Sequence, residues 1–333
     1  MMADRVLVTG GSGVVGGAAI RALRASGAEV VSLQRGPLPP PLAALGVIEA
    51  RGDVTNAAAV AQVMQGIDAV VHAAGRVDIT GQWEEFERAN VQGTRVVLAA
   101  AEGAGVTRFV FVSSPSVAHV GHALVGAGAE PADPEGARGD YARSKALAER
   151  DALAADRPGF AVTAIRPHLV WGAGDTQLTA RIIERARAGR LVLIGSGAAL
   201  IDTTYIDNVG DALAAAVARV QDDGVHGRAF VVSNGEPRTV AEMLTRIAWA
   251  AGLPGPSRSV PYPVARAGGR VVEEVWERSG REGEPPVTAF LAEQLATAHW
   301  FDQRQTRQAL GWSPAVSLDE GFERLAAALQ ATP

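Results

Sequence analysis

The residue types that can do acid–base chemistry come together in one short segment, Tyr141-Ala-Arg-Ser-Lys145. Tyr141 and Lys145 are four residues apart, so their side chains would share one face of a helix. A phenol with the usual pKa of about 10 exchanges protons poorly at neutral pH, and a nearby ammonium favours the phenolate. A pKa lowered by about three units would suit Tyr141 to general acid–base catalysis. The same spacing also occurs on plain solvated helix faces, so this hypothesis needs support from elsewhere in the chain.

A glycine-rich string near the start of the chain gives that support. It follows the apolar run Val6-Leu7-Val8, typical of a buried strand, and leads into Val14–Ala25, which has the spacing of an amphipathic helix. In this context backbone N–H groups and the helix dipole favour a pyrophosphate. Gly10 would permit the tight turn, Gly13 the close approach of the ligand, and Gly16 the packing of helix on strand. The same glycines could also form an ordinary turn.

The elements that must position these residues alternate strand and helix through the first half. The predicted strands are Val6–Val8, Glu29–Leu33, Val47–Ala50, Ala69–His72, Phe109–Val112 and Ala161–Arg166. The predicted helices are Val14–Ala25, Asn56–Met64 with Thr55 as its cap, Trp83–Ala101 and Tyr141–Ala155. This order predicts an α/β fold of Rossmann type, a doubly wound parallel sheet with helices on both faces. Strand ends should then meet in one crevice, and they carry Gly10, Ala73, Ser114 and Pro167.

The pattern loosens after Trp171, which predicts two domains. Residues 1–170 would form the cofactor-binding domain, with segments from about 203–235 returning to it, and 171–333 mainly a smaller substrate-binding domain. The helices predicted there are Thr179–Ala188, Asn208–Val220, Val240–Ala251, Ala265–Glu277, Ala289–Ala298 and Leu318–Leu329. The predicted strands are Leu191–Ile194, Thr203–Ile206 and Ala229–Val232. A loop rich in Gly, Pro and Asp is predicted over His119–Asp140.

Composition narrows the classes of function. The 333 residues carry a net charge of −5 without a long run of one sign, which disfavours a nucleic-acid partner. The chain has no cysteine, which excludes disulfides, thiolate metal sites and cysteine catalysis. No His/Asp/Glu cluster has metal-ligand spacing, and no apolar run approaches the roughly 18 residues that span a bilayer. We expect a cytoplasmic protein without a signal peptide or metal. The segment Val264–Trp276 could still attach to a membrane or partner surface, or line an acyl pocket.

The ordered set of motifs resembles the extended short-chain dehydrogenases/reductases, and within them the 3β-hydroxysteroid dehydrogenase-like branch. The motifs are Thr9-Gly10-x-x-Gly13-x-x-Gly16, Gly52-Asp53-Val54, His72-Ala73-Ala74, Asn90-Val-x-Gly93-Thr94, Ser113-Ser114, Tyr141-x-x-x-Lys145, Arg166-Pro167-x-x-x-x-Gly172-x-Gly174-Asp175 and Leu310-Gly311-Trp312-x-Pro314. Further strings are similar to the 2-alkyl-3-oxoalkanoate reductases of that branch, among them Pro115-Ser116-Val117-x-His119 and Asp202-x-Thr204-Tyr205-Ile206-Asp207-Asn208.

The resemblance implies an oxidoreductase acting on CH-OH groups with NAD(P), one that reduces a 2-alkyl-3-oxoalkanoic acid or a similar bulky β-keto substrate. Tyr141 would donate the proton to the ketone, Lys145 would lower the pKa of Tyr141 and hold the nicotinamide ribose, and Ser114 would orient the carbonyl. The cofactor would lie against Gly10, Ser12, Gly13, Val14, Val15, Gly16, Asp53, Val54, Ala73, Ala74, Tyr141, Lys145, Pro167 and Leu169. Asn90 would be structural or support a water. The family also forms homodimers through the helices predicted at 83–101 and 141–155.

The end of the second strand bears on the choice of cofactor. Enzymes that bind NAD commonly place a carboxylate there for the ribose 2′-hydroxyl, whereas this chain has Gln34 followed by Arg35. An arginine can pair with a 2′-phosphate through charge-assisted hydrogen bonds. NADP(H) is therefore the preferred prediction, and NAD(H) stays possible if Arg35 only stacks on adenine.

Three other functions stay open at this point. A 3β-hydroxysteroid or sterol dehydrogenase would share the same machinery. A nucleotide-sugar epimerase would need tightly held NAD and cations for a diphosphate, which Arg181, Arg185 and Arg187 could supply. A non-enzymatic NADP-sensing protein would more often lack the Tyr/Lys pair. Among the remaining residues, His72 is predicted to be a core or turn residue, and Trp276, Trp300 and Trp312 to be packing residues.

Overall fold

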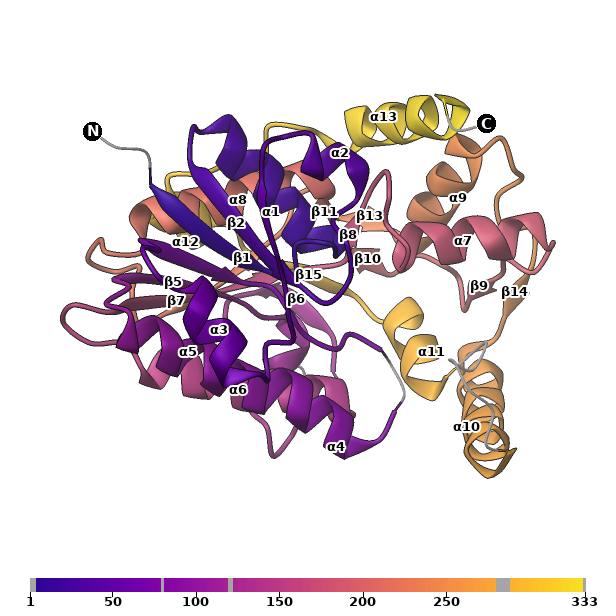
Figure 1. Cartoon of the computed structure of the whole chain (residues 1–333). Coiled ribbons are helices and arrows are strands. Elements are labelled where there is room, and N and C mark those ends of the chain that lie inside the picture. The colour runs from indigo at the N-terminus through magenta and orange to yellow at the C-terminus, as the bar shows by residue number, and fades with distance from the viewer. Residues whose placement is uncertain (1–3, 79–80, 119–121, 280–287, 332–333) are drawn as a thin grey trace.

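The computed structural model describes residues 4–78, 81–118, 122–279 and 288–331, and a seven-stranded parallel sheet lies at its centre (Figure 1). Its strands are β1 (Arg5–Thr9), β2 (Glu29–Gln34), β3 (Ile48–Arg51), β4 (Ala69–His72), β5 (Arg108–Val112), β7 (Ala161–Pro167) and β12 (Ala229–Val232). They are ordered β12-β7-β5-β4-β1-β2-β3, and every neighbouring pair is parallel. The order reverses beside β1, as in a doubly wound sheet, which confirms the predicted Rossmann-type fold.

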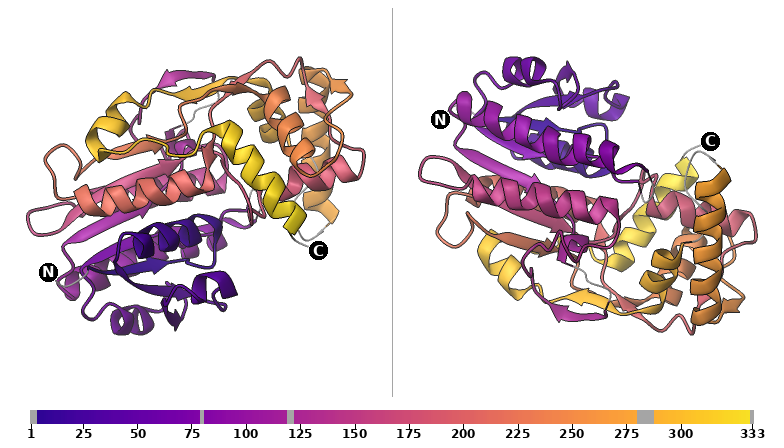
Figure 2. Two further views of the ribbon diagram at one scale, coloured as in Figure 1. Left: turned by 90° about the horizontal axis from the view of Figure 1, so that it is seen from above. Right: turned by 90° about the horizontal axis from the view of Figure 1, so that it is seen from below.

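Helices cover both faces of this sheet, as the two views in Figure 2 show. One face carries α1 (Val14–Ala25) and α8 (Ile206–Arg219), and the other carries α3 (Ala57–Val63), α5 (Gly93–Gly103) and α6 (Asp140–Ala154). The burial of β1 explains its unbroken apolar sequence, because Val6 and Val8 join one hydrophobic cluster while Leu7 joins the other. The contact between α1 and α8 is so close that a Cβ at Gly210 would lie 2.4 Å from the carbonyl oxygen of Ala18.

Two predictions about the first-half helices are corrected by the structure. Thr55 does not cap α3, because its hydroxyl donates to Asp53, while Asn56 is the cap and accepts from the backbone N–H of Ala59. The predicted helix over 83–101 is interrupted. It consists of α4 (Trp83–Phe86), a π-helical turn at Glu87–Gln92, and α5. A π turn inserts one extra residue per turn, which helical periodicity in the sequence does not reveal.

The loop predicted over His119–Asp140 is wrong in part. Strand β6 (Leu124–Ala127) lies within it and pairs in parallel with β15 (His299–Phe301), which was also not predicted. These two strands join β10 (Leu200–Ile201) and β13 (Arg238–Thr239) in a four-stranded sheet, and α12 (Arg304–Leu310) follows β15. The strands are two to four residues long and too short for a periodic pattern. His119 lies outside the described residues.

The remaining elements belong to neither of these two sheets. They are α2 (Pro40–Ala43), β8 (Val170–Trp171), α7 (Leu178–Arg187), β9 (Leu193–Ile194), β11 (Thr204–Tyr205), α9 (Val240–Ala250), β14 (Ser259–Val260), α10 (Tyr262–Ser279), α11 (Ala289–Ala296) and α13 (Leu318–Ala331). One face of α10 packs on α11, while the exposed face carries Val264, Val271 and Val275, each more than half exposed. None of the helices within the described ranges is long and apolar enough to cross a membrane.

Candidate active site

The three side chains predicted to be catalytic lie together at the carboxyl edge of the central sheet. Ser114 follows β5 and Tyr141 is the second residue of α6; the Ser114 hydroxyl lies near enough to act on the pKa of Tyr141, and it hydrogen-bonds the Ser116 hydroxyl at 2.9 Å. Lys145 lies one turn further along α6 and donates from Nζ to the carbonyl oxygen of Val112 at 2.6 Å. The same nitrogen lies 4.1 Å from the centre of the Phe111 ring. The end of β5 and the first two turns of α6 therefore form one polar site.

The surroundings of Tyr141 and Lys145 shift both pKa values. Burial raises the pKa of Tyr141 above its usual range, and the hydrogen bond with Ser114 acts in the opposite direction. Burial lowers the pKa of Lys145 to about 7, and the carboxylate of Glu149 opposes this shift. Lys145 is directed at a backbone carbonyl here, and no effect of its charge on the phenol pKa is resolved. A lowering of the Tyr141 pKa by Lys145 stays a prediction for the complex with cofactor.

The glycine string has the geometry that the predicted anion site requires. Gly10 has a φ of +75°, and a Cβ there would lie 2.8 Å from the backbone of Ala74. A Cβ at Gly16 would lie 2.2 Å from the carbonyl oxygen of Gly10, so this position requires glycine. Helix α1 starts after Gly13 without a side-chain cap, which leaves its first N–H groups available to a phosphate. A Cβ at Gly13 would meet only the Gly10 carbonyl oxygen, at 3.3 Å, so the space in front of it is open. These features fit a dinucleotide pyrophosphate.

The end of β2 carries a buried hydrogen-bond donor, on Gln34, and next to it the exposed Arg35. Gln34 is 5% exposed, and its Oε1 accepts a hydrogen bond from the Ser32 hydroxyl at 2.5 Å. Its Nε2 has no hydrogen-bond partner among the described residues. Two hydrogen bonds from Thr55, the backbone one being the larger effect, lower the pKa of Asp53, and the charges of Arg35 and Arg88 add to this. Arg88 was not predicted, because it lies on the π-helical turn rather than at a strand end.

A buried network holds the end of β4 in place. The backbone N–H of Ala74 donates to the Thr9 hydroxyl, which also hydrogen-bonds His72 at 2.7 Å. The other ring nitrogen of His72 meets Thr94 at 3.0 Å. Burial, with a smaller contribution from the charge of Lys145, lowers the pKa of His72 to about 3, so the ring is neutral at neutral pH. His72 is therefore a core residue, as predicted. In the described parts of the chain, no three His, Asp or Glu residues gather closely enough to hold a metal.

Asn90 links the segment that follows β4 to helix α6. Its Oδ1 accepts from the backbone N–H of Arg76 at 2.7 Å, and its Nδ2 donates to the Arg76 carbonyl at 3.0 Å and to the Ser144 hydroxyl at 2.8 Å. Ser144 in turn donates to the carbonyl oxygen of Tyr141. Of the two roles left open by the sequence, these bonds favour the structural one. The π-helical turn directs Asn90 into this position.

We expect Asn90→Ala to destabilise the protein by about 1–3 kcal/mol, because it leaves buried backbone groups of Arg76 without partners. The kcat should fall as well, since α6, which carries Tyr141 and Lys145, loses its link to the segment that follows β4. Urea denaturation and steady-state kinetics would measure the two effects. Asn56→Ala is the control, because it removes only the cap of α3 and should cost about 1 kcal/mol without changing the kinetics. Normal stability and rate in Asn90→Ala would contradict the structural role.

The carboxyl end of β7 lies next to Ser114, because β5 and β7 are neighbours in the sheet. Pro167 ends β7, and Leu169 follows with a φ of +42°, the one non-glycine residue of the described chain in the left-handed region. Such strained backbone is found where the surrounding structure fixes it, often at binding sites. The carbonyl oxygen of Leu169 accepts from the backbone N–H of Thr204 at 3.3 Å. The predicted contacts to nicotinamide therefore lie beside the predicted catalytic serine.

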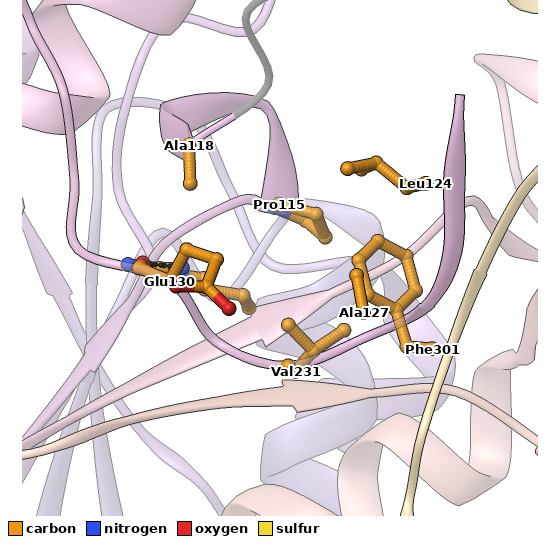
Figure 3. Close-up of a pocket in the computed structure, with 9 residues that line it drawn as sticks. Pro115, Ala118, Leu124, Ala127, Glu130, Val231 and Phe301 are labelled. Carbon is orange, nitrogen blue, oxygen red and sulfur yellow. Dashed lines mark hydrogen bonds between the residues drawn. The ribbon is translucent and has the colours of Figure 1, made fainter. Parts of the chain in front are cut away.

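A narrow pocket is lined by Pro115, the residue after Ser114, and by side chains from several strands (Figure 3). Its lining comes from the segment after Ser114, from β6 and the segment that follows it, and from β7, β12 and β15, and consists of Pro115, Ala118, Leu124, Ala127, Gly128, Glu130, Arg166, Val231 and Phe301. Most of these side chains are apolar, and Arg166 is the cation in its wall. The sequence did not point to β6 or Phe301, because their strands were not predicted.

Comparison with known proteins agrees with this geometry. Residues 7–262 match the model of the 3-beta hydroxysteroid dehydrogenase/isomerase family. A 2-alkyl-3-oxoalkanoate reductase of Stenotrophomonas maltophilia is 40% identical over 326 residues, covering 97% of this chain and 98% of the relative. The enzyme of the same name from Shewanella oneidensis is 37% identical over 98% of this chain and 86% of its own length. A 3-beta-hydroxysteroid dehydrogenase of Mycolicibacterium neoaurum is 31% identical over 96% of this chain and 89% of its length.

Solved structures show the same architecture with a nicotinamide cofactor. MoeE5 in complex with UDP-glucuronic acid and NAD is 26% identical, with a TM-score of 0.75 over 99% of this chain and 100% of that chain. The chain therefore belongs to the 3-beta hydroxysteroid dehydrogenase/isomerase family of extended short-chain dehydrogenases/reductases, and it is an NAD(P)-dependent oxidoreductase acting on CH-OH groups.

Proposed function

We propose that this enzyme interconverts a ketone and a secondary alcohol with NADP(H), and that it reduces a 2-alkyl-3-oxoalkanoic acid or a similar bulky β-keto substrate. The observation that carries the reaction type is the placement of Tyr141 near Ser114 and one helical turn before the buried Lys145, at the carboxyl edge of the sheet. The two relatives named 2-alkyl-3-oxoalkanoate reductase, similar over nearly the whole chain, support the substrate class.

In this mechanism the cofactor supplies a hydride to the carbonyl carbon. Tyr141 donates the proton of its hydroxyl to the carbonyl oxygen, and Ser114 orients that oxygen through its own hydroxyl. Burial raises the pKa of Tyr141, so the phenol keeps its proton until the substrate accepts it. Lys145 holds the nicotinamide ribose and, as an ammonium, lowers the pKa of Tyr141 when the site is loaded.

The cofactor-binding roles are proposals that rest on the geometry of the crevice. The pyrophosphate would lie on the glycine string and on the amides around Ser12, Val14 and Val15. Asp53 and Val54 would border the adenine, Ala73 and Ala74 would lie below the riboses, and Pro167 and Leu169 would contact the nicotinamide. In the corresponding domain division, residues 1–170 with segments of 203–235 bind the cofactor, and the rest of 171–333 mainly binds the substrate.

The preference for NADP(H) rests on the donors at the end of β2. No carboxylate stands at this position to accept from a ribose 2′-hydroxyl, because the residue is Gln34, whose Oε1 accepts from Ser32 and whose Nε2 is buried. Arg35 is exposed next to it and adds a positive charge.

We expect Arg35→Ala to raise the KM for NADPH at least ~10-fold, since a hydrogen bond to a charged group contributes about 1.5–3 kcal/mol. The KM for NADH should stay within about threefold, because NADH has no 2′-phosphate. Initial rates with both cofactors would measure this. The control is Arg95→Ala, which removes an exposed arginine that pairs with Asp151 on α6. An unchanged KM for NADPH would exclude the phosphate-pairing role.

A substrate panel tests the proposed function itself. Purified enzyme is assayed with NADPH and NADH against 2-alkyl β-keto acids, steroids and aromatic ketones. We expect the highest kcat/KM for the branched β-keto acids with NADPH. A preference for steroids would favour the second candidate, a 3β-hydroxysteroid dehydrogenase, which the relative from Mycolicibacterium neoaurum supports. Tightly bound NAD would favour an epimerase, and binding without turnover a cofactor-sensing protein.

A further inference from the structure

A buried ion pair joins the catalytic helix α6 to strand β7. The side chains of Arg166 and Glu149 are each 1% exposed. Arg166 donates from Nε to one carboxylate oxygen of Glu149 at 2.8 Å and from Nη2 to the other at 2.5 Å. Its Nη1 donates to the backbone carbonyl of Glu130 at 2.8 Å, in the segment between β6 and α6. One guanidinium therefore ties together three parts of the chain that border the site.

Both residues are neighbours of the catalytic site, although the mechanism above uses neither. Glu149 lies four residues after Lys145, so the two side chains share a face of α6. Arg166 immediately precedes Pro167 and forms part of the wall of the pocket beside Ser114 (Figure 3).

Stability alone does not explain a charged pair at this place. Removing two charges from water is costly, and apolar residues of similar volume often stabilise a protein as well as a buried ion pair does. A bidentate pair differs from an apolar contact in its directionality, because two parallel hydrogen bonds fix the orientation of both side chains. The Arg166–Glu149 pair can therefore set the height and rotation of α6 on the sheet.

We propose that Arg166 and Glu149 are positioning residues for the proton transfer. They hold α6 against β7 so that Tyr141 meets Ser114 and Lys145 meets the Val112 carbonyl, and Glu149 keeps a negative charge beside the Lys145 ammonium. This inference rests on the proposed roles of Tyr141 and Lys145. It assigns a purpose to a pair that the mechanism above leaves unused.

The groups around Lys145 determine how its charge should depend on pH. On its own helix Lys145 faces Tyr141 and Glu149, from β4 it faces the neutral His72, and from β5 the Val112 carbonyl and the Phe111 ring. Arg166 on β7 faces Glu149 rather than Lys145. Glu149 raises the pKa of Lys145 against the effect of burial. Lys145 loses its positive charge as the pH rises through its pKa. Removing the Glu149 carboxylate should lower this pKa, so the charge is lost at a lower pH.

The main test replaces the pair by apolar side chains in Arg166→Met/Glu149→Met. We expect the double variant to fold, with a kcat at least ~10-fold lower and a substrate KM within about threefold, because orientation rather than binding is lost. NADPH fluorescence titrations without ketone should show that the cofactor affinity of the variant falls with rising pH about one pH unit below the wild-type transition. A wild-type kcat together with a wild-type pH profile in the folded variant would overturn the proposal.

A second variant and a control separate the possible causes. Glu149→Gln keeps the shape of the side chain, so it should show the same downward pH shift, and an unchanged profile would count against the proposal. Arg157→Met/Glu102→Met removes an exposed ion pair beyond the other end of α6 and should change neither quantity. The binding titration needs no turnover. If the wild-type enzyme reduces none of the ketones, the proposed substrate is wrong, while the pH shift still decides the role of the pair.

Discussion

Tyr141→Phe is expected to lower kcat at least ~100-fold, the usual size of a general-acid contribution. The variant loses one hydroxyl, the group whose pKa responds to the nearby Ser114 at the carboxyl edge of the sheet. The ring remains, so packing of α6 on the sheet should change little. Affinity for NADPH should stay within about threefold, because the proposed contacts to the phosphates come from α1 and the glycine string. The measurement is kcat with saturating NADPH and the best ketone of the panel.

The chain offers a matched control for this experiment. It has three tyrosines, and Tyr262 opens α10, far along the chain from the glycine string and the catalytic helix. Tyr262→Phe should leave kcat and the affinity for NADPH unchanged. If Tyr141→Phe turned over ketones at a near-normal rate, another group would have to supply the proton, and the proposed mechanism would fall.

Alanine at two glycines of the string, Gly16 and Gly13, should affect different properties: stability in the first case and cofactor binding in the second. In Gly16→Ala the new Cβ would lie 2.2 Å from the Gly10 carbonyl oxygen, so the turn must move. We expect a loss of about 3 kcal/mol in the free energy of unfolding, at the upper end of the usual cost of overpacking. In Gly13→Ala the Cβ meets only one backbone oxygen, at 3.3 Å, so the protein should fold with nearly normal stability.

NADPH affinity distinguishes Gly13→Ala from Gly16→Ala. Because a Cβ at Gly13 would occupy space proposed for the pyrophosphate, Gly13→Ala should weaken NADPH binding at least ~10-fold, or by about 1.4 kcal/mol. Thermal unfolding with and without NADPH, together with fluorescence titration, would measure both properties. Ala104→Gly, next to the C-terminal end of α5, is a control for a change of one methyl group away from the site. Normal NADPH affinity in Gly13→Ala would contradict the proposed phosphate site.

The central sheet could be predicted because its strands are buried on both faces. Each is a short apolar run, and strict alternation with helices leaves few possible arrangements. The same regularity predicts that Tyr141, Lys145 and Ser114 lie at one edge of the sheet. Their gathering depends on local elements, one strand end and two turns of one helix, which sequence patterns describe well.

The rest depends on contacts between distant segments. Strand β6 pairs with β15 across more than half of the chain, and neither is long enough to show alternation. Asn56 rather than Thr55 caps α3 because the Thr55 hydroxyl is hydrogen-bonded to Asp53. Arg166 stands in a sequence motif and Glu149 does not, but nothing local reveals that they pair, because a buried ion pair has no local signature. Such features become visible only when the partners are seen together.

The position of β12 at the edge of the central sheet has a consequence for how the chain is made. During synthesis β7 leaves the ribosome well before β12, so the nascent sheet waits with an open, hydrogen-bonding edge. Helix α8, which covers the face of Val6 and Val8, also comes from the second half. Early fragments therefore expose both an edge and an apolar surface, and a chaperone that binds extended apolar segments should hold them until α8 and β12 emerge. A gene truncated after Pro167 should accordingly yield aggregated protein rather than an isolated nucleotide-binding domain.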